Sequence, residues 1–255
     1  MNFILLAAGA LSEKILENVK ISECLRDNLV GAVVSNEVRA LLPNNKQIRI
    51  EKISGKKETE EKLLKLIKQT RPQYILSIQY PWILSKEVIE KMCGRILNLH
   101  NAKLPEYRGH NSLSHEILNN EKYHTTSLHW IDAVVDRGRL VNSITIPINL
   151  TDTAFDLWEK SSKSADELIR SWFVELQDEQ TLPAGKSIPC GGRYYSKDLE
   201  PYKCVPVNAS PSDIDRWARA FHFPPHEPAY IEHGGNRIYL LHTTWQYSKM
   251  KEISE

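Results

Sequence analysis

The sequence has few cysteines and few glycines, and each shortage excludes a class of protein. Among 255 residues there are four cysteines, and the closest two, Cys190 and Cys204, are fourteen positions apart. This spacing excludes a C-x-x-C zinc knuckle and a dense disulfide scaffold, and it predicts reduced thiols. None of the eleven glycines belongs to a G-x-G-x-x-G fingerprint, because Gly9 stands among alanines. A nicotinamide dinucleotide site is therefore not expected.

The sequence also lacks an excess of charge and a long apolar run. Its 33 basic and 32 acidic residues give a formal net charge of +1. Such a balance provides no overall field to attract nucleic acid or anionic lipid. The apolar opening from Phe3 to Leu11 is too short to span a membrane, and no Lys or Arg precedes it as in a leader. We expect a cytoplasmic protein with neither a nucleic-acid nor a membrane partner.

The first hundred residues alternate short apolar runs with amphipathic helical patterns. The expected strands cover residues 3–8, 30–35, 47–53, 74–79 and 96–100. Alternation of this kind predicts an α/β fold with a doubly wound, mostly parallel sheet that is covered on both faces. Ligands bind beyond the carboxyl ends of such strands, so residues near 7–10, 78–84 and 98–110 should meet in one crevice.

The rest of the chain predicts two further strands, a long helix and a small module. The strands are expected at 124–131 and 140–148, and a T-x-x-D box (Thr153, Asp156) begins the helix. One helix face should lie in the core, namely Trp158, Ala165, Ile169, Trp172 and Leu176. Proline and glycine become frequent after Leu182, and Gly234-Gly235 predicts a hairpin. We therefore expect a catalytic domain at 1–182 and a small hairpin-containing module at 183–255.

The segment ILNLHNAKLPEYRG, residues 96–109, carries the clearest chemical signal. Asn98 and His100 are two positions apart on an expected strand, so both side chains leave the same face at its carboxyl end. Further along, Asp136 precedes Gly138 at a turn between two expected strands. An amide that donates a hydrogen bond, an imidazole that moves a proton and a carboxylate that orients the imidazole suffice for acyl transfer. We therefore predict Asn98, His100 and Asp136 as catalytic residues.

These residues resemble the folate-dependent formyltransferases. The shared pattern is N-x-H, then L-P-x-Y-R-G (Leu104 to Gly109), then D-x-G with its aspartate thirty-six residues after the histidine. The likeness covers residues 74–176 and is looser over the first seventy. Where the family often has an acidic residue after the D-x-G turn, this chain has Arg139. The segments GGRYY (191–195) and ARAFHFPPHEPAYIE (218–232) are similar to the tail of the sugar N-formyltransferases within that family.

The resemblance implies a Rossmann-like formyltransferase fold and a transfer reaction. The donor would be N10-formyltetrahydrofolate, with no metal, and the acceptor a dTDP- or GDP-linked 3-amino- or 4-amino-dideoxyhexose used for surface polysaccharide. The pterin would be held mainly by main-chain groups of Trp82, Ile83, Leu84, Ile131, Asp132 and Val134. The diphosphate would be bound by Arg108, Arg193 and Lys197, with Trp130, Tyr194 or Tyr195 against the base or sugar. Members of this group are often homodimers that pair through the tail.

Other functions remain open at this point. A phosphoribosylglycinamide formyltransferase, a methionyl-tRNA formyltransferase and a formyltetrahydrofolate hydrolase would use the same three side chains. A non-catalytic nucleotide-binding module would keep the tail without needing His100. The tRNA enzymes carry a basic tail, whereas residues 196–255 hold seven Lys or Arg against eight Asp or Glu. A metal site formed by His100, His110, His115 and Asp136 lacks the H-x-x-x-H spacing that would support it.

Overall fold

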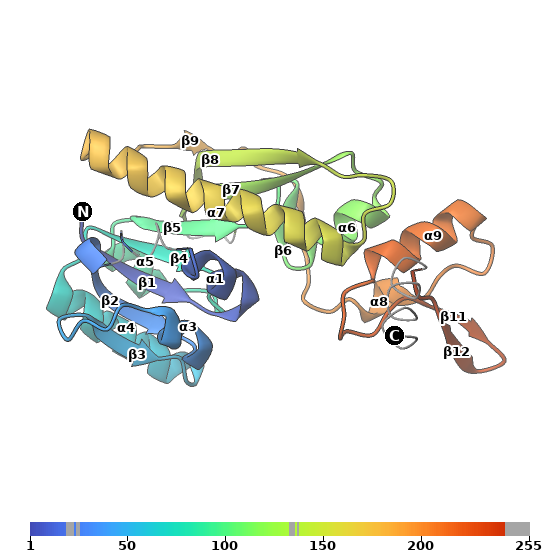
Figure 1. The fold of residues 1–255 in the computed structure, drawn as a ribbon, viewed down its shortest axis with the longest axis horizontal. Helices are drawn as coiled ribbons and strands as arrows, with labels where there is room; N and C mark the ends of the chain where they lie inside the picture. The colour runs from blue at the N-terminus through green and yellow to red at the C-terminus, as the bar shows by residue number, and fades with distance from the viewer. Residues whose placement is uncertain (19–22, 24–25, 133–135, 137, 243–255) are drawn as a thin grey trace, which may run out of the picture.

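A single mixed sheet organises the molecule (Figure 1). The computed structural model describes residues 1–18, 23, 26–132, 136 and 138–242. Within these residues the sheet has eight strands, in the order β3 (Arg49–Lys52), β2 (Leu29–Val34), β1 (Phe3–Ala7), β4 (Tyr74–Ile78), β5 (Ile96–His100), β7 (Tyr123–Ile131), β8 (Gly138–Pro147) and β9 (Lys186–Ser187). The first five run parallel, and the last three add antiparallel pairs. The prediction of a doubly wound, mostly parallel sheet is confirmed.

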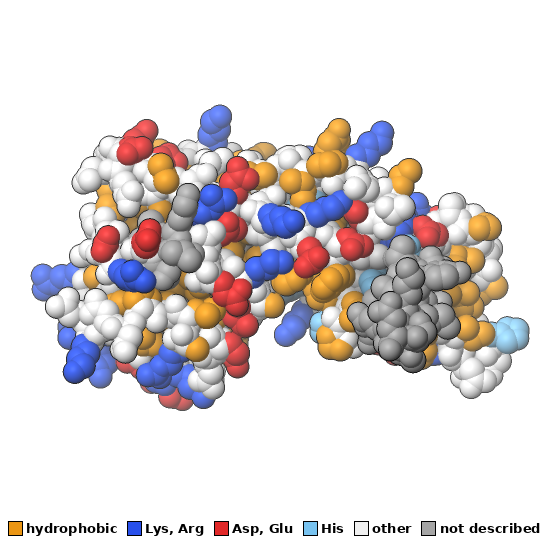
Figure 2. Space-filling view, in the orientation of Figure 1, with side chains coloured by type: hydrophobic (Ala, Val, Ile, Leu, Met, Phe, Trp, Pro, Cys, Tyr) orange, Lys and Arg blue, Asp and Glu red, His pale blue; other side chains and the backbone are white. Residues whose placement is uncertain are grey.

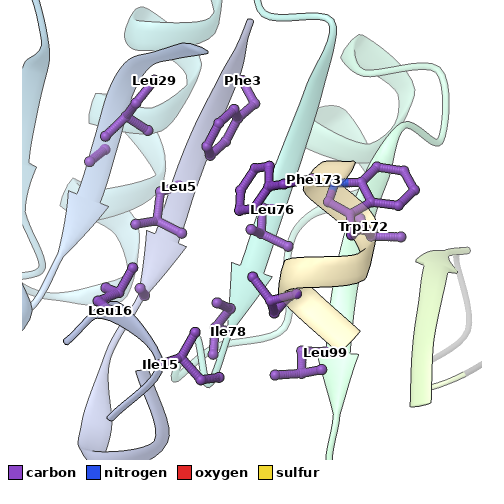
Figure 3. Close-up of a cluster of buried hydrophobic side chains, with 14 of the residues drawn as sticks. Phe3, Leu5, Ile15, Leu16, Leu29, Leu76, Ile78, Leu99, Trp172 and Phe173 are labelled. Carbon is purple, nitrogen blue, oxygen red and sulfur yellow. The ribbon is translucent and has the colours of Figure 1, made fainter. Parts of the chain in front are cut away.

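Both faces of the parallel half are covered by helices, as the continuous apolar runs of its strands require. Alternate residues of β1 point to opposite faces, so Phe3 and Leu5 belong to one buried cluster and Ile4 and Leu6 to another. The first face packs against α1 (Gly9–Leu16), α3 (Asn36–Leu41) and α7 (Ala154–Glu179), and the second against α4 (Lys56–Thr70) and α5 (Lys86–Lys91). Figure 3 shows Phe3 beside Phe173 of α7 in the first cluster.

Helix α7 begins where the T-x-x-D box predicts. The Asp156 N–H donates to Thr153 Oγ1 over 3.1 Å, and the Thr153 N–H donates to the Asp156 carboxylate over 2.9 Å. This pair satisfies two backbone donors that a helix start leaves open. Four residues of the expected face, Ala165, Ile169, Trp172 and Leu176, are buried in the core. Trp158 is only half-buried and belongs to the site described below.

After the sheet, the chain returns to the loop that follows β5. Strand β10 (Arg193–Tyr195) pairs in parallel with β6 (Tyr107–Gly109), which leads into α6 (Ser112–Leu118). The last described elements are α8 (Glu200–Lys203), α9 (Pro211–Ala220), β11 (Tyr230–His233) and β12 (Asn236–Tyr239). The hairpin prediction is confirmed, since Gly234 and Gly235 take φ of 57° and 77° between β11 and β12.

Two segments beyond residue 182 are tied to the first part of the chain. Strand β9 extends the main sheet beside β8, and β10 pairs with β6. A third apolar cluster joins Ile117 of α6 and Leu157 of α7 to Ala220 and Phe221 at the end of α9. The division at residue 182 stays a prediction, and elements on its two sides share backbone pairing and a core. In the described part of the chain, no helix has the length and apolarity to cross a bilayer.

Candidate active site

The three predicted catalytic side chains come together at the carboxyl end of β5. Asn98 and His100 are two positions apart on this strand and therefore share one face. Both line the same cavity, together with Asp136. His100 Nδ1 lies 3.8 Å from Asp136 Oδ1, and both side chains are nearly buried, with exposed fractions of 11% and 12%. Asp136 itself takes a positive φ of 50° in the turn that precedes β8. This turn brings a carboxylate from across the sheet to the end of β5.

The hydrogen bonds of His100 and Asp136 identify the nitrogen that can accept a proton. His100 Nε2 lies 2.8 Å from the Tyr107 carbonyl oxygen, which can only accept, so Nε2 carries the hydrogen. In the neutral ring, Nδ1 then holds a lone pair. Asp136 Oδ2 accepts from the Gly109 N–H over 2.7 Å, which leaves Oδ1 turned toward Nδ1. Once Nδ1 is protonated, this carboxylate stabilises the imidazolium.

Asn98 is oriented by a second histidine. Its Nδ2 lies 3.2 Å from His129 Nε2, and His129 Nδ1 lies 3.2 Å from the Trp130 carbonyl oxygen. The carbonyl fixes the hydrogen of His129 on Nδ1, so Nε2 accepts from the Asn98 amide. One of the two Asn98 N–H groups is thereby used, and the second is left to donate to a ligand in the cavity. His129 also lines the cavity, although the sequence did not predict a role for it in the site.

The cavity has a volume of about 810 Å³ and gathers residues that are far apart in the sequence. One group comes from the loops after β4 and β7 and from α1 and α5; after the residues predicted to bind the folate donor we call it the donor wall, and it comprises Leu11, Gln79, Tyr80, Pro81, Trp82, Ile83, Leu84, Ile89, Ile131 and Asp132. Another group comes from α7 and the last elements; we call it the acceptor wall, and it comprises Trp158, Tyr194, Lys197, Asp198, Leu199, Glu200, Lys203, Phe221, Phe223, His226 and Glu227. The catalytic residues belong to the same cavity.

Five of the six residues expected to bind the pterin lie in the donor wall: Trp82, Ile83, Leu84, Ile131 and Asp132. The sixth, Val134, lies outside the described residues. Gln79 belongs to the segment 78–84 that was predicted to enter the crevice, although no binding role was predicted for it; it takes a φ of 51°, and its Oε1 accepts from the Leu11 N–H over 2.9 Å. This contact ties the loop after β4 to the first turn of α1. The only sequence signal for it is its place directly after a buried strand.

The residues expected to bind the acceptor are divided. Tyr194 and Lys197 lie in the acceptor wall. Arg108 and Arg193 lie outside the described cavity lining: an Arg108 guanidinium nitrogen is 3.5 Å from the Gly192 carbonyl oxygen, and the Arg193 guanidinium lies over the Tyr195 ring. The diphosphate role expected of these two arginines therefore has no support in their positions.

Two of the aromatic residues expected to stack on the acceptor are core residues, so that prediction is wrong for them. Trp130 is 2% exposed, packs on Trp172, and donates from Nε1 to the Pro183 carbonyl oxygen over 2.8 Å. Tyr195 is 5% exposed and stacks between other rings, on Tyr107 and His115. Because side chains alternate along a strand, β7 directs His129 and β10 directs Tyr194 into the cavity, and the neighbouring rings of Trp130 and Tyr195 point away from it.

Trp158 takes the place of these rings in the cavity, contrary to the expectation that it lies in the core. It lines the acceptor wall and meets Phe223 edge to face, with 5.9 Å between ring centroids. Phe155 stacks on Trp158 and also meets Phe223, and Lys14 Nζ lies 4.7 Å from the Trp158 ring centroid. The pattern of the helix could not distinguish a ring packed on the sheet from a ring beyond the end of the sheet.

Carboxylates and lysines alternate along the acceptor wall. Lys203 Nζ lies 3.3 Å from Glu200 and 3.0 Å from Glu227. Hydrogen bonds from the Tyr239 hydroxyl and from Lys203 lower the pKa of Glu227 to about 2. Among the described residues Lys197 forms no ion pair, so its charge is available to an anionic ligand. No group of three or more His, Cys, Asp or Glu side chains in the described part of the chain is arranged to hold a metal ion.

Comparison with known proteins places this geometry in a family context. Residues 27–171 match the formyl transferase family. Over 169 residues the chain is 30% identical to the GDP-perosamine N-formyltransferase of Brucella melitensis, an alignment that covers 66% of this chain and 64% of that protein. The chain thus spans slightly less than two thirds of that relative's length.

Solved structures share the fold over nearly the whole chain. A 4-N formyltransferase from Francisella tularensis superposes with a TM-score of 0.74 at 16% identity, covering 94% of this chain and 96% of that one. An N-formyltransferase from Helicobacter canadensis, solved in complex with folinic acid and dTDP-3-aminofucose, has a TM-score of 0.64 at 20% identity and covers 93% and 86%. At these identities the likeness is one of fold.

Proposed function

This chain belongs to the formyl transferase family, and on that premise we propose that it transfers a formyl group from N10-formyltetrahydrofolate to the amino group of a nucleotide-linked aminodideoxy sugar. The observation that carries the proposal is the arrangement of His100: its Nε2–H is used by the Tyr107 carbonyl, and the lone pair on Nδ1 is beside Asp136 at the cavity. A base so placed can take the proton that an amine loses when it attacks a carbonyl carbon.

The chain's own residues divide the work of the transfer. When bound, the folate supplies an activated formyl group. His100 Nδ1 accepts a proton from the amine as its nitrogen bonds to the formyl carbon. It then gives this proton to N10 of the folate, whose bond to the formyl carbon breaks. The free N–H of Asn98 donates to the formyl oxygen, where negative charge develops, a contribution typically worth about 10²–10³ in rate. Asp136 stabilises the imidazolium between the two proton transfers.

The donor wall fits a flat heterocycle with a polar edge. Tyr80, Trp82, Ile83 and Leu84 offer apolar surface, and the backbone of the loop that carries them offers N–H and carbonyl groups. We propose that Trp82, Ile83, Leu84, Ile131 and Asp132 hold the pterin, with no metal. The Helicobacter canadensis N-formyltransferase was solved with folinic acid bound, which supports a folate in this family.

The acceptor wall favours a small, hydroxyl-rich acceptor over a large polyanion. Two lysines, Lys197 and Lys203, stand against three carboxylates, Asp198, Glu200 and Glu227, and Lys203 is paired with two of them. Carboxylates bind sugar hydroxyls, and Trp158 with Phe223 provides an aromatic corner for a base or a sugar ring. We propose Lys197 and Tyr194 as contacts of the diphosphate and the nucleoside. A tRNA would need a broad basic surface, and on the face drawn in Figure 2 the positive and negative side chains are interspersed.

Family membership and the acceptors of similar proteins support further parts of the proposal. We propose cytoplasmic formylation of dTDP- or GDP-linked 3-amino- or 4-amino-dideoxyhexoses for surface polysaccharide, by a homodimer. The GDP-perosamine and dTDP-3-aminofucose named for two similar proteins support this class of acceptor. The runner-up acceptors are phosphoribosylglycinamide and methionyl-tRNA.

A panel assay tests the proposed function. The purified protein is incubated with N10-formyltetrahydrofolate and each of several dTDP- and GDP-linked amino sugars, with phosphoribosylglycinamide and methionyl-tRNA in parallel. We expect at least one nucleotide sugar to gain the mass of one formyl group. Release of formate at a comparable rate without any amine would identify a hydrolase, and formylation of only the two runner-up acceptors would overturn the sugar assignment.

A further inference from the structure

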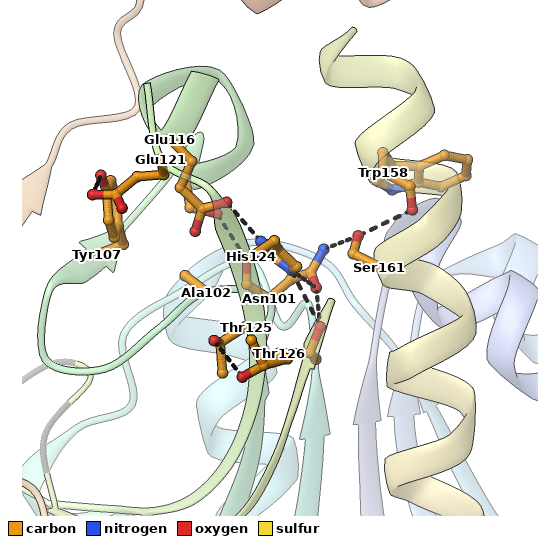
Figure 4. A network of polar contacts seen from close by, with 12 residues as sticks. Asn101, Ala102, Tyr107, Glu116, Glu121, His124, Thr125, Thr126, Trp158 and Ser161 are labelled. Carbon is orange, nitrogen blue, oxygen red and sulfur yellow. Dashed lines mark hydrogen bonds and ion pairs between the residues drawn. The ribbon is translucent and has the colours of Figure 1, made fainter. Parts of the chain in front are cut away.

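A second imidazole–carboxylate pair, His124 and Glu116, is drawn in Figure 4, and neither of its residues lines the cavity. His124 of β7 and Glu116 of α6 have exposed side-chain fractions of 0% and 1%, and His124 Nδ1 lies 2.7 Å from Glu116 Oε2. The proposed mechanism uses neither residue. Burying two ionisable groups costs free energy unless their hydrogen bonds are complete, so the partners of this pair indicate its role.

The acceptors around the pair fix the direction of its hydrogen bonds. Burial raises the pKa of Glu116, and among the described residues its Oε1 has no hydrogen-bond partner. On the other side of the ring, His124 Nε2 lies 3.2 Å from Asn101 Oδ1, which can only accept. His124 Nε2 is therefore the donor to Asn101.

Asn101 follows His100 directly, and both its side chain and its backbone carbonyl form hydrogen bonds. The Thr126 hydroxyl donates to its Oδ1 over 2.8 Å, and its Nδ2 donates to Ser161 Oγ over 2.8 Å. The Ser112 hydroxyl donates to its backbone carbonyl over 2.7 Å. Elements β7, α6 and α7 therefore meet at the one residue that begins the turn after β5. The same turn leads to Tyr107, whose carbonyl sets the tautomer of His100.

We propose that Glu116 and His124 are positioning residues for catalysis: through Asn101 they fix the turn after β5, and so hold the His100 imidazole with Nδ1 facing Asp136 and Nε2 on the Tyr107 carbonyl. This inference rests on the proposed function, because it assigns a task in the reaction of His100. A displacement of about 1 Å in a catalytic group costs up to about a hundredfold in rate, so a small shift of the turn is enough to be measured.

A double variant separates positioning from folding. Replacing both groups by apolar ones of similar size, Glu116→Leu with His124→Phe, leaves no unpaired charge in the core and should be close to neutral for stability. The double variant still removes the His124 N–H that donates to Asn101 Oδ1. We expect kcat to fall by about tenfold while KM for the formyl donor and for the amine stays within about twofold. Glu116→Gln, whose amide N–H can donate to Nδ1 in place of the acid proton, should retain most of the activity.

A milder pair of variants covers the case in which the double variant does not fold. Thr126→Val removes one donor to Asn101, and Thr125→Val is its matched control, because the Thr125 hydroxyl pairs with Thr145 Oγ1 at 2.9 Å on the other side of the same strand. We expect a loss in kcat for Thr126→Val and none for Thr125→Val. Equal kcat in both, or a double variant within twofold of wild type, would overturn the inference.

The inference can also be judged without turnover. If the wild type formylates none of the acceptors, the proposed function fails, and ¹⁵N spectra of histidine-labelled protein decide the positioning claim alone. The signal of His100 is assigned by its loss in His100→Asn. We expect a single Nε2–H tautomer in the wild type and an average of two tautomers in the Glu116→Leu/His124→Phe or Thr126→Val variant. An unchanged tautomer in the variant would overturn the inference.

Discussion

At the scale of single residues, the proposed chemistry depends on which nitrogen of His100 carries the lone pair. The main-chain carbonyl of Tyr107 fixes the hydrogen on Nε2, and Asp136 lies beside Nδ1 on the other side of the ring. The sequence predicted that Asn98, His100 and Asp136 belong to one site because their order and spacing form a pattern along the chain, and the structure brings them together. It did not predict Trp158 in the cavity or Trp130 in the core, because an aromatic residue in a buried pattern can lie on either side of the same element.

Asn98→Ala tests the amide that is proposed to donate to the formyl oxygen. We expect kcat to fall by about 10²–10³, with affinity for the acceptor unchanged, because the lost hydrogen bond matters most when charge develops. Steady-state kinetics together with calorimetric titration of the acceptor measure the two effects. A rise in KM with kcat intact would assign Asn98 to ground-state binding instead.

Asp136→Asn tests the charge beside His100 while keeping the size of the side chain. Its Oδ1 can still accept from the Gly109 N–H, but its Nδ2 would then face His100 Nδ1 and donate to the lone pair that should take a proton. We expect kcat to fall by about a hundredfold or more, with circular dichroism unchanged. Activity within a few-fold of wild type would show that the carboxylate is dispensable.

At the scale of elements, the site is assembled by pairings that the sequence does not reveal. Seven of the eight strands of the sheet could be predicted because each carries an apolar or alternating run, whereas the two-residue β9 (Lys186–Ser187) carries none and was not predicted. Strands β6 and β10 are three residues each and lie more than eighty positions apart, yet their pairing places Tyr194 and Lys197 in the cavity. Such short strands have no periodicity of their own, so only the folded chain reveals their partners.

Gly109→Ala tests the contact between β6 and β10. Gly109 has a φ of 90°, and a Cβ placed there would lie 2.2 Å from the Tyr195 carbonyl oxygen, so the strands must separate. We expect a loss of about 1–3 kcal/mol in the free energy of unfolding, measured with urea, and reduced activity because the Gly109 N–H moves from Asp136. Gly55→Ala is the control, since Gly55 has an ordinary φ of −66° and its added Cβ would have open space. Equal stability of the two variants would contradict this account of the strand pair.

At the scale of the whole molecule, the sheet and the elements after residue 182 line one cavity and pack together in one buried region. His115 of α6 lies where they pack, stacked on Tyr195 of β10 with 4.0 Å between ring centroids and edge-on to Tyr202 of α8. Burial, helped by the charge of Arg193, lowers the pKa of His115 to about 4. The histidine is therefore neutral in the folded protein at pH values where an unfolded chain would bind a proton.

His115→Phe tests the effect of this buried ring on stability. As the pH falls from about 6.5 to about 4, the unfolded wild-type chain gains a proton at His115 and the folded chain does not, so the wild type loses stability over this window. Phenylalanine keeps the ring contacts and removes the titration. We expect the variant to gain on the order of 2 kcal/mol relative to wild type between pH 7 and pH 4, measured by urea unfolding at both. A constant difference between the two proteins would contradict the assigned burial.

The most direct test is a single-turnover measurement of formyl transfer to the best acceptor of the panel, with wild type and His100→Asn compared at one pH. We predict that the variant binds the nucleotide sugar with unchanged affinity but transfers at least about a hundredfold more slowly than wild type. Transfer by His100→Asn at the wild-type rate would contradict the assignment of Nδ1 as the base and, with it, the mechanism.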